Sequence, residues 1–175
     1  MRSFFATSTW TYAHVPPPTG SSISTTTVVD PLNNETDYTF SGGYEVQRLI
    51  YQGCLSSTPG CTITSGRVLL ETVLTCYNGN QTNCGTVTTA PSLPINQIDK
   101  YTLIAGKSTQ SRSTTLFDAY NNVTDTKAYD FVCTTAATPV CTAPTNETVI
   151  TYGSYSRKLW GYWQPHRQQT MQDSG

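Results

Sequence analysis

One motif occurs twice in the chain, as Asp30-Pro31-Leu32-Asn33-Asn34-Glu35-Thr36-Asp37 and as Asp118-Ala119-Tyr120-Asn121-Asn122-Val123-Thr124-Asp125. The two copies align without gaps and match at five of eight positions, which are the first Asp, both Asn, the Thr and the last Asp. An acidic side chain can bond the backbone of a turn, and Asn tolerates left-handed φ. The motif therefore predicts a β-hairpin turn in each copy, with Asp30, Asn33 and Asn34 or Asp118, Asn121 and Asn122 as the turn residues.

Aromatic residues follow both copies, Tyr38 and Phe40 in the first and Tyr129-Asp130-Phe131 in the second. We expect the Thr of each copy and these aromatic residues to enter the strand that returns from the turn. A weaker third copy is Asn146-Glu147-Thr148, which leads to Tyr152.

Alternating and β-branched segments surround the motif, and no segment has a sustained helical period. The Asn78-Gly79 dipeptide predicts a type I′ hairpin turn, because both residues can take positive φ. Ala90 to Asp99 contains Pro91 and Pro94 and predicts a connector. The sequence thus predicts an all-β fold of consecutive antiparallel hairpins, with strands at Thr25–Val29, Thr36–Phe40, Tyr44–Gly53, Val68–Tyr77, Tyr101–Ile104, Ser113–Phe117, Thr124–Phe131 and Thr148–Tyr152.

Length and composition predict one domain with irregular ends. The chain has 175 residues, of which 12% are charged, and its formal net charge is −1. We expect residues 1–24 to be a disordered lead-in rich in Pro, Ser and Thr, because Pro16, Pro17 and Pro18 remove backbone donors. Residues 25–155 should form the hairpin region, and residues 156–175 a disordered tail rich in Gln, basic and aromatic residues.

Composition also excludes two classes of partner. Ten Lys and Arg scattered among eleven acidic residues give no basic footprint for nucleic acid. No segment approaches the roughly 20 apolar residues that a membrane-spanning helix needs. The first 20 residues contain no apolar run typical of a signal peptide.

The six cysteines form three close pairs along the chain, Cys54 with Cys61, Cys76 with Cys84, and Cys133 with Cys141. Turn-forming residues lie inside each pair, so chain reversal can bring the two Cα atoms within disulfide distance. Zinc and free thiols remain the alternatives, although structural zinc sites favour two to four residues between ligands, whereas these pairs have six or seven. Three local disulfides would indicate an extracytoplasmic protein, secreted or at the cell surface, despite the missing signal peptide.

The two motif copies, with Tyr38-Thr39-Phe40 and Tyr129-Asp130 after them, resemble the tyrosine-aspartate (YD) repeats of bacterial RHS proteins. The resemblance covers about residues 25–155. It implies hairpins side by side in a curved sheet that forms a shell, often around a C-terminal toxin, and some YD-repeat proteins are linked to carbohydrate contact. The chain departs from the family pattern at Asn33 and Asn121, where Gly is usual, and at Phe40, where Tyr is usual.

Catalysis is not predicted, and neither is a cofactor. The Asp residues lie in turns or at strand ends, where Asp ordinarily bonds the backbone. The two His, His14 and His166, lie in the predicted disordered ends. No nucleophile-elbow, zinc-protease or phosphate-loop motif occurs. A calcium site formed by Asp30, Asn33 and Asp37 is a further hypothesis, but its spacing departs from the usual Asp-rich calcium loop.

Two functional hypotheses follow. In the first, the chain is a non-enzymatic structural module of an RHS-like surface or secreted protein, and its partner is the rest of a larger repeat polypeptide or an enclosed cargo domain. In the second, it is a small disulfide-stapled carbohydrate-binding module, in which Trp160, Tyr162 and Trp163 stack on sugar rings.

Overall fold

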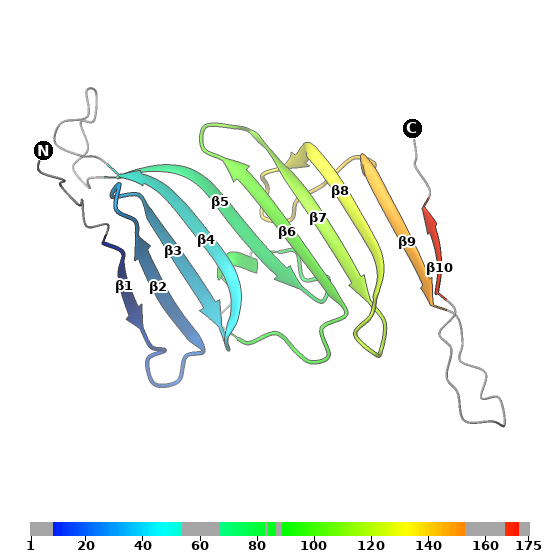
Figure 1. The fold of residues 1–175 in the computed structure, drawn as a ribbon, viewed down its shortest axis with the longest axis horizontal. Coiled ribbons are helices and arrows are strands. Elements are labelled where there is room, and N and C mark those ends of the chain that lie inside the picture. The colour runs from blue at the N-terminus through cyan, green and yellow to red at the C-terminus, as the bar shows by residue number, and fades with distance from the viewer. Residues whose placement is uncertain (1–8, 54–66, 83, 87–88, 153–166, 172–175) are drawn as a thin grey trace, which may run out of the picture.

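The described residues of the chain fold into a single ten-stranded antiparallel sheet whose strands follow one another in chain order (Figure 1). The computed structural model describes residues 9–53, 67–82, 84–86, 89–152 and 167–171. The strands are β1 (Thr11–Val15), β2 (Ile23–Val29), β3 (Glu35–Ser41), β4 (Tyr44–Gly53), β5 (Arg67–Tyr77), β6 (Gln97–Ile104), β7 (Thr109–Phe117), β8 (Val123–Thr134), β9 (Asn146–Tyr152) and β10 (Arg167–Met171). A short 3-10 helix, η1 (Cys84–Thr86), lies between β5 and β6. The prediction of an all-β fold of consecutive hairpins is confirmed.

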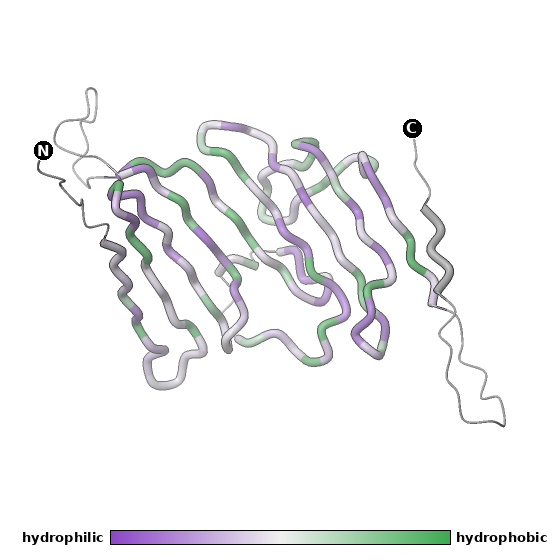
Figure 2. The backbone as a smooth tube through the Cα atoms, in the orientation of Figure 1, coloured by the Kyte–Doolittle hydropathy of each residue, from purple (hydrophilic) through white to green (hydrophobic). Residues whose placement is uncertain are grey.

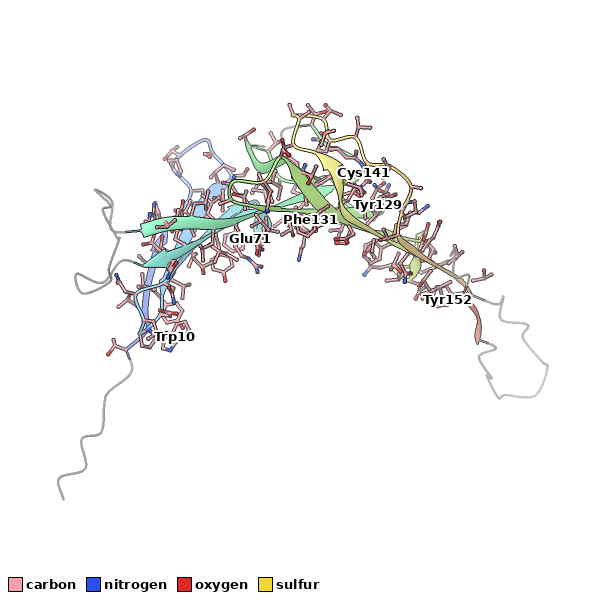
Figure 3. The ribbon with its side chains drawn as sticks, turned by 90° about the horizontal axis from the view of Figure 1, so that it is seen from above. Trp10, Glu71, Tyr129, Phe131, Cys141 and Tyr152 are labelled. Atoms are coloured by element: carbon pink, nitrogen blue, oxygen red, sulfur yellow. A yellow bond between two sulfur atoms is a disulfide. The ribbon has the colours of Figure 1, made fainter. Side chains whose placement is uncertain are left out.

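The sheet is one layer thick and bent into an arch (Figure 3). Each strand pairs only with its neighbours in sequence. The segment that carries Cys141 lies on the outer, convex side of the arch (Figure 3). Hydrophobic and hydrophilic residues are interspersed along the coloured strands of the sheet (Figure 2). Among the described residues, no second layer of secondary structure buries one face of the sheet, as it would in an ordinary domain.

Bulges help to explain the curvature. The register shifts between Thr39 and Phe40 and between Ile50 and Tyr51, and it shifts twice more in the pairing of β7 with β8. An extra residue on one strand bends that strand and increases its twist. Phe131 in β8 has a φ of 30°, a left-handed value that is unusual for an aromatic residue.

The hydrophobic core is small and lies at the middle of the sheet. Cys76, Cys84 and Tyr101 form its buried cluster, and Leu74 and Cys141 pack against it. Several residues buried nearby are polar, among them Asp99, Gln110 and Thr114. Local packing of residues from β5, β6 and β7 with the two segments that carry Cys84 and Cys141, rather than a continuous apolar layer, holds this part of the sheet together.

The sheet extends beyond both predicted boundaries of the hairpin region, at residues 25 and 155. Thr11–Val15, placed by the sequence in a disordered lead-in, pairs with β2 over five residues. Arg167–Met171, placed in a disordered tail, pairs with β9. Both predictions were wrong for these segments, because a strand needs only a neighbouring backbone edge to pair with. The prolines at 16–18 end β1 and do not prevent it.

The Asn78-Gly79 turn forms, but its hairpin does not close at once. Asn78 and Gly79 have φ of 55° and 72°, and the Asn80 amide donates to the Tyr77 carbonyl at 3.0 Å. The returning strand β6 begins only at Gln97. The chain first makes an excursion through η1 that brings Cys84 to Cys76.

Within the described ranges, no helix has the length and apolar character to span a membrane.

Candidate functional site

The two motif copies form the same turn. In the first, Asp30 Oδ1 accepts hydrogen bonds from the amides of Leu32 and Asn34, both at 2.8 Å, and Oδ2 accepts one from Asn34 Nδ2 at 2.9 Å. The Asn33 amide donates to the Asp30 carbonyl at 2.9 Å, and Asn33 has a φ of 65°. The predicted roles of Asp30, Asn33 and Asn34 as turn residues match this geometry.

The second turn repeats each of these bonds. Asp118 Oδ1 accepts from the amides of Tyr120 and Asn122 at 2.8 and 2.9 Å, and Oδ2 accepts from Asn122 Nδ2 at 3.0 Å. Asn121 has a φ of 64°. Hydrogen bonds from Asn34 and Asn122, respectively, lower the pKa of Asp30 and of Asp118 below the ordinary value. Both carboxylates therefore bond the backbone and the Asn side chain of their own turns.

The first turn also docks against the end of β4. The Gly53 amide donates to Asn34 Oδ1 at 3.2 Å, and a Cβ on Gly53 would lie 1.7 Å from the Asn33 carbonyl oxygen. Only glycine fits there. The weaker third copy forms no such turn, since Asn146 is the first residue of β9 and pairs with Ala128.

Two of the three predicted disulfides are present, Cys76–Cys84 and Cys133–Cys141, with Cα separations of 5.2 and 4.0 Å. Cys133 and Cys141 also form a β-bridge, as expected for a hairpin clip. Cys76–Cys84 instead ties β5 to η1. The predicted pair Cys54 and Cys61 lies outside the described residues. The two bonds are compatible with an oxidising compartment.

The two disulfide-closed segments meet over the middle of the sheet. Thr82 and Thr138 share a hydrogen bond between their hydroxyl oxygens, which lie 2.9 Å apart. A cavity of about 180 Å³ lies between these segments and the sheet. Its lining includes Gln81, Gln110, Tyr101 and Pro139. The segments thus cover part of one face that the fold otherwise leaves bare.

A polar network lies on the same face, because Asp99 is directly opposite Cys76 in the register. Asp99 is fully buried. Its Oδ1 accepts from Arg112 Nη2 at 2.7 Å, Arg112 Nε at 3.1 Å and Thr114 Oγ1 at 2.7 Å. Its Oδ2 accepts from the side-chain amides of Gln97 at 2.7 Å and Gln81 at 3.3 Å. Gln81 therefore links the disulfide-closed segment that covers this face to the Asp99 carboxylate of β6.

Arg112 also lies over two tyrosine rings. Its guanidinium carbon is 5.6 Å from the centroid of Tyr101 and 5.2 Å from that of Tyr129. The Tyr101 hydroxyl is buried and has no hydrogen-bond partner. Burial is the main cause that raises the pKa of Tyr101 to about 12. The network neutralises Asp99 and satisfies its oxygens, so its role is structural.

Sequence reasoning missed this network. Gln97, Asp99 and Tyr101 alternate along one strand, so they share a face with each other. That spacing beside a large aromatic residue could have marked Asp99 as inward-facing. Its partners Arg112 and Thr114 depend on the register of β6 with β7, which no local pattern fixes.

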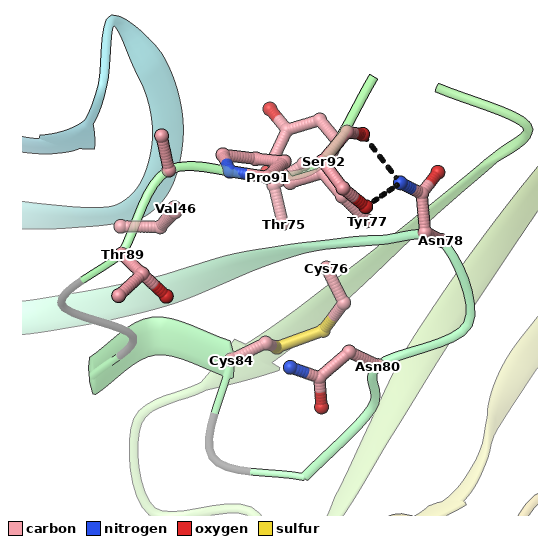
Figure 4. A pocket seen from close by; sticks show the side chains of 11 residues that line it. Val46, Thr75, Cys76, Tyr77, Asn78, Asn80, Cys84, Thr89, Pro91 and Ser92 are labelled. Atoms are coloured by element: carbon pink, nitrogen blue, oxygen red, sulfur yellow. Dashed lines mark hydrogen bonds between the residues drawn. A yellow bond between two sulfur atoms is a disulfide. The ribbon is translucent and has the colours of Figure 1, made fainter. Parts of the chain in front are cut away.

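A second cavity, of about 370 Å³, lies between β5 and the segment before β6 (Figure 4). Neutral side chains line it, including Asn78, Asn80, Thr89 and Ser92. Asn78 Nδ2 donates to the Ser92 carbonyl at 2.7 Å and lies 3.2 Å from the Ser92 hydroxyl (Figure 4). No titratable base is among these lining residues apart from the Tyr77 phenol. The cavity offers hydrogen bonds but no nucleophile with a base beside it.

A groove of about 810 Å³ lies where β5, β6 and β7 meet the connector before β6 and the Asp118 turn. Tyr44 and Tyr77 line it in an edge-to-face pair with ring centroids 5.5 Å apart. The Tyr77 hydroxyl donates to the Glu45 carbonyl at 2.9 Å, which fixes the ring. Phe117 and the exposed Leu93 add apolar surface. Three aromatic side chains, those of Tyr44, Tyr77 and Phe117, therefore line this groove.

The calcium hypothesis is not supported by the geometry. Asp37 accepts from the Thr27 hydroxyl at 2.6 Å and pairs with Arg67, whereas Asp30 serves its turn. No cluster of three or more metal-ligating side chains occurs in the part of the chain that the structure describes. The predicted sugar-stacking residues Trp160, Tyr162 and Trp163 lie outside that part.

Comparison of the chain with protein-family models, curated proteins and solved structures gave no match. Functional conclusions therefore rest on the sheet, its repeated turns and its cavities.

Proposed function

We propose that the chain is a structural module of an extracytoplasmic, RHS-like repeat protein, in which it forms a segment of a shell or scaffold. The observation that carries this proposal is the arched single layer of consecutive hairpins. In the described residues a sheet of this kind presents two broad faces, with β1 and β10 as its outermost strands, which suits it to surround or present another domain.

Three further features support the proposal. The two Asp-Asn turns have the same hydrogen bonds, as expected of repeated units. The two disulfides are compatible with an extracytoplasmic location. The charged side chains in the described ranges mostly pair with each other, as Lys127 does with Asp125 and Glu147. None of these pairs has the geometry of a general acid and base acting on a substrate.

The test is immunoblotting of the source cells with an antibody raised against this chain. We expect a band well above the 19.2 kDa of the chain, removed when intact cells are treated with protease. A band at 19.2 kDa that survives protease until the cells are lysed would refute the proposal. Lysed cells treated with the same protease serve as the control for accessibility.

Carbohydrate binding is the second candidate function. The groove lined by Tyr44 and Tyr77 supports it, and this groove replaces Trp160, Tyr162 and Trp163 as the proposed place for a sugar. Tyrosine rings can stack on the apolar faces of sugar rings. Titration of the purified chain with soluble oligosaccharides, followed by tyrosine fluorescence, tests this function. A response that Tyr44→Ala abolishes would support it, and no response to any sugar would count against it.

A further inference from the structure

The β1 edge of the sheet is exposed over its whole length. All five residues of β1 are exposed. Trp10, Tyr12 and Val15 are 54%, 71% and 61% exposed, which concentrates large apolar side chains on six consecutive residues. In the described part of the chain, β2 is the only strand that pairs with β1. The outward backbone groups of β1 are therefore available to another strand.

This edge also lacks the features that usually prevent strand addition. Natural edge strands carry Lys, an inward-facing charge, a proline or a bulge. Thr11-Tyr12-Ala13-His14-Val15 contains no Asp, Glu, Lys, Arg or Pro. Its pairing with β2 is regular over five consecutive residues, without the bulges found between β3 and β4.

We propose that two copies of the chain pair through their β1 strands, antiparallel and about a two-fold axis at Ala13, to form one continuous sheet. An isologous contact of this kind closes on itself and gives a dimer. The proposal goes beyond the shell role, and a monomeric chain would leave that role untouched.

The sequence of β1 is complementary to itself in this register. Antiparallel pairing about Ala13 opposes all five strand residues, with Thr11 across from Val15 of the second copy and Tyr12 across from His14. Both are favourable pairs, because β-branched and aromatic side chains pack well across strands. Directly opposite residues share a face, so each side chain keeps the face that it has in the single chain.

Ala13 is the sensitive position, since it lies opposite its own copy. A small side chain there lets the strands approach closely. Like charges directly opposite each other destabilise a strand pair, and opposite charges stabilise it. Charges placed at this position should therefore control association without altering the exposed surface of the monomer elsewhere.

The test is sedimentation equilibrium of the purified, oxidised full chain over a range of concentrations. We expect the mass to rise from 19.2 kDa toward twice that value. Ala13→Lys and Ala13→Glu should each remain monomeric at concentrations where the parent chain is dimeric. An equimolar mixture of the two variants should recover the dimer. Ala119→Lys, the same change in an exposed turn, should dimerise like the parent.

Several results would overturn the proposal. They are a parent chain that stays monomeric, an Ala13→Lys variant that still associates, or a mixture that does not recover the dimer. Growth into open-ended polymers would indicate that β1 pairs with β10 of the next copy instead. Circular dichroism of each variant, with unchanged sheet content, shows that the charge acts on association and not on folding.

Discussion

Removal of the Asp99 carboxylate should destabilise the sheet more than any other single change to an ion pair in the described residues. Asp99 is fully buried, and the side chain of its partner Arg112 is only 13% exposed. Asp99→Ala removes the acceptor for Arg112, Thr114, Gln97 and Gln81 together. The guanidinium then remains close to the two tyrosine rings without its counter-charge.

The magnitude follows from the cost of leaving one partner of a buried ion pair unpaired, which is about 3–5 kcal/mol. A domain is commonly stable by only about 5–15 kcal/mol, so the loss is a large part of the total. Asp99→Asn should lower the free energy of unfolding less. The Asn oxygen can still accept from Arg112, and rotation of the Gln97 side-chain amide lets its oxygen accept from the new NH2 group. We therefore expect the order of stability to be parent, Asp99→Asn, Asp99→Ala.

The assay is equilibrium unfolding in urea, followed by circular dichroism under oxidising conditions. Glu147→Ala is the control, because its ion pair with Lys127 is partly exposed, with side-chain exposures of 34% and 28%. A pair of this kind contributes about 0–1 kcal/mol. If Asp99→Ala lowers the free energy of unfolding by no more than Glu147→Ala does, the buried network does not hold the sheet together.

Three further predictions concern other parts of the molecule. Tyr101→Phe should stabilise the fold slightly, since it removes a buried hydroxyl that lacks a partner. Because the folded pKa of Tyr101, about 12, lies above the ordinary value of 10.0, the parent chain should lose stability as the pH rises from 10 through 12. An equal loss of stability in the Tyr101→Phe variant over this pH range would contradict the prediction. The pKa of Asp118 is lowered by Asn122, so the stability it contributes is present above pH 3.8 and is lost as pH falls through the folded pKa; a carboxyl resonance that titrates above 3.8 by NMR would disprove the turn geometry. Replacing Cys133 and Cys141 together by Ser should lower the free energy of unfolding by about 2–3 kcal/mol on the chain-entropy model, measured in urea, whereas an unchanged midpoint would mean that the disulfide adds nothing.

Local sequence patterns predicted most of the strands, because alternation and turn chemistry act over a few residues. The Asp30 turn is the clearest case, since its bonds join residues at most four apart. Partners distant in sequence were not predictable in this way. Arg112 reaches Asp99 only through the register of β6 with β7, which no local pattern fixes. Likewise, β1 forms by pairing with the edge of β2, and the composition of Thr11–Val15 alone did not indicate a strand.

The distribution of disulfides and side-chain hydrogen bonds along the sheet explains how a single layer of strands can hold its shape. The backbone of each strand pairs only with its neighbours in sequence, so stability is close to a sum of neighbouring pairs, as in other repeat architectures. At the middle, the two disulfides, the Thr82–Thr138 hydrogen bond and the Asp99 network join β5 to β8 by more than backbone pairing. At the β1 edge, the side-chain hydrogen bond between His14 and Thr26 lies exposed at the surface. The described side-chain cross-links are thus concentrated at the middle of the sheet, whereas β1 keeps an exposed edge, as the proposed pairing of β1 with a second copy requires.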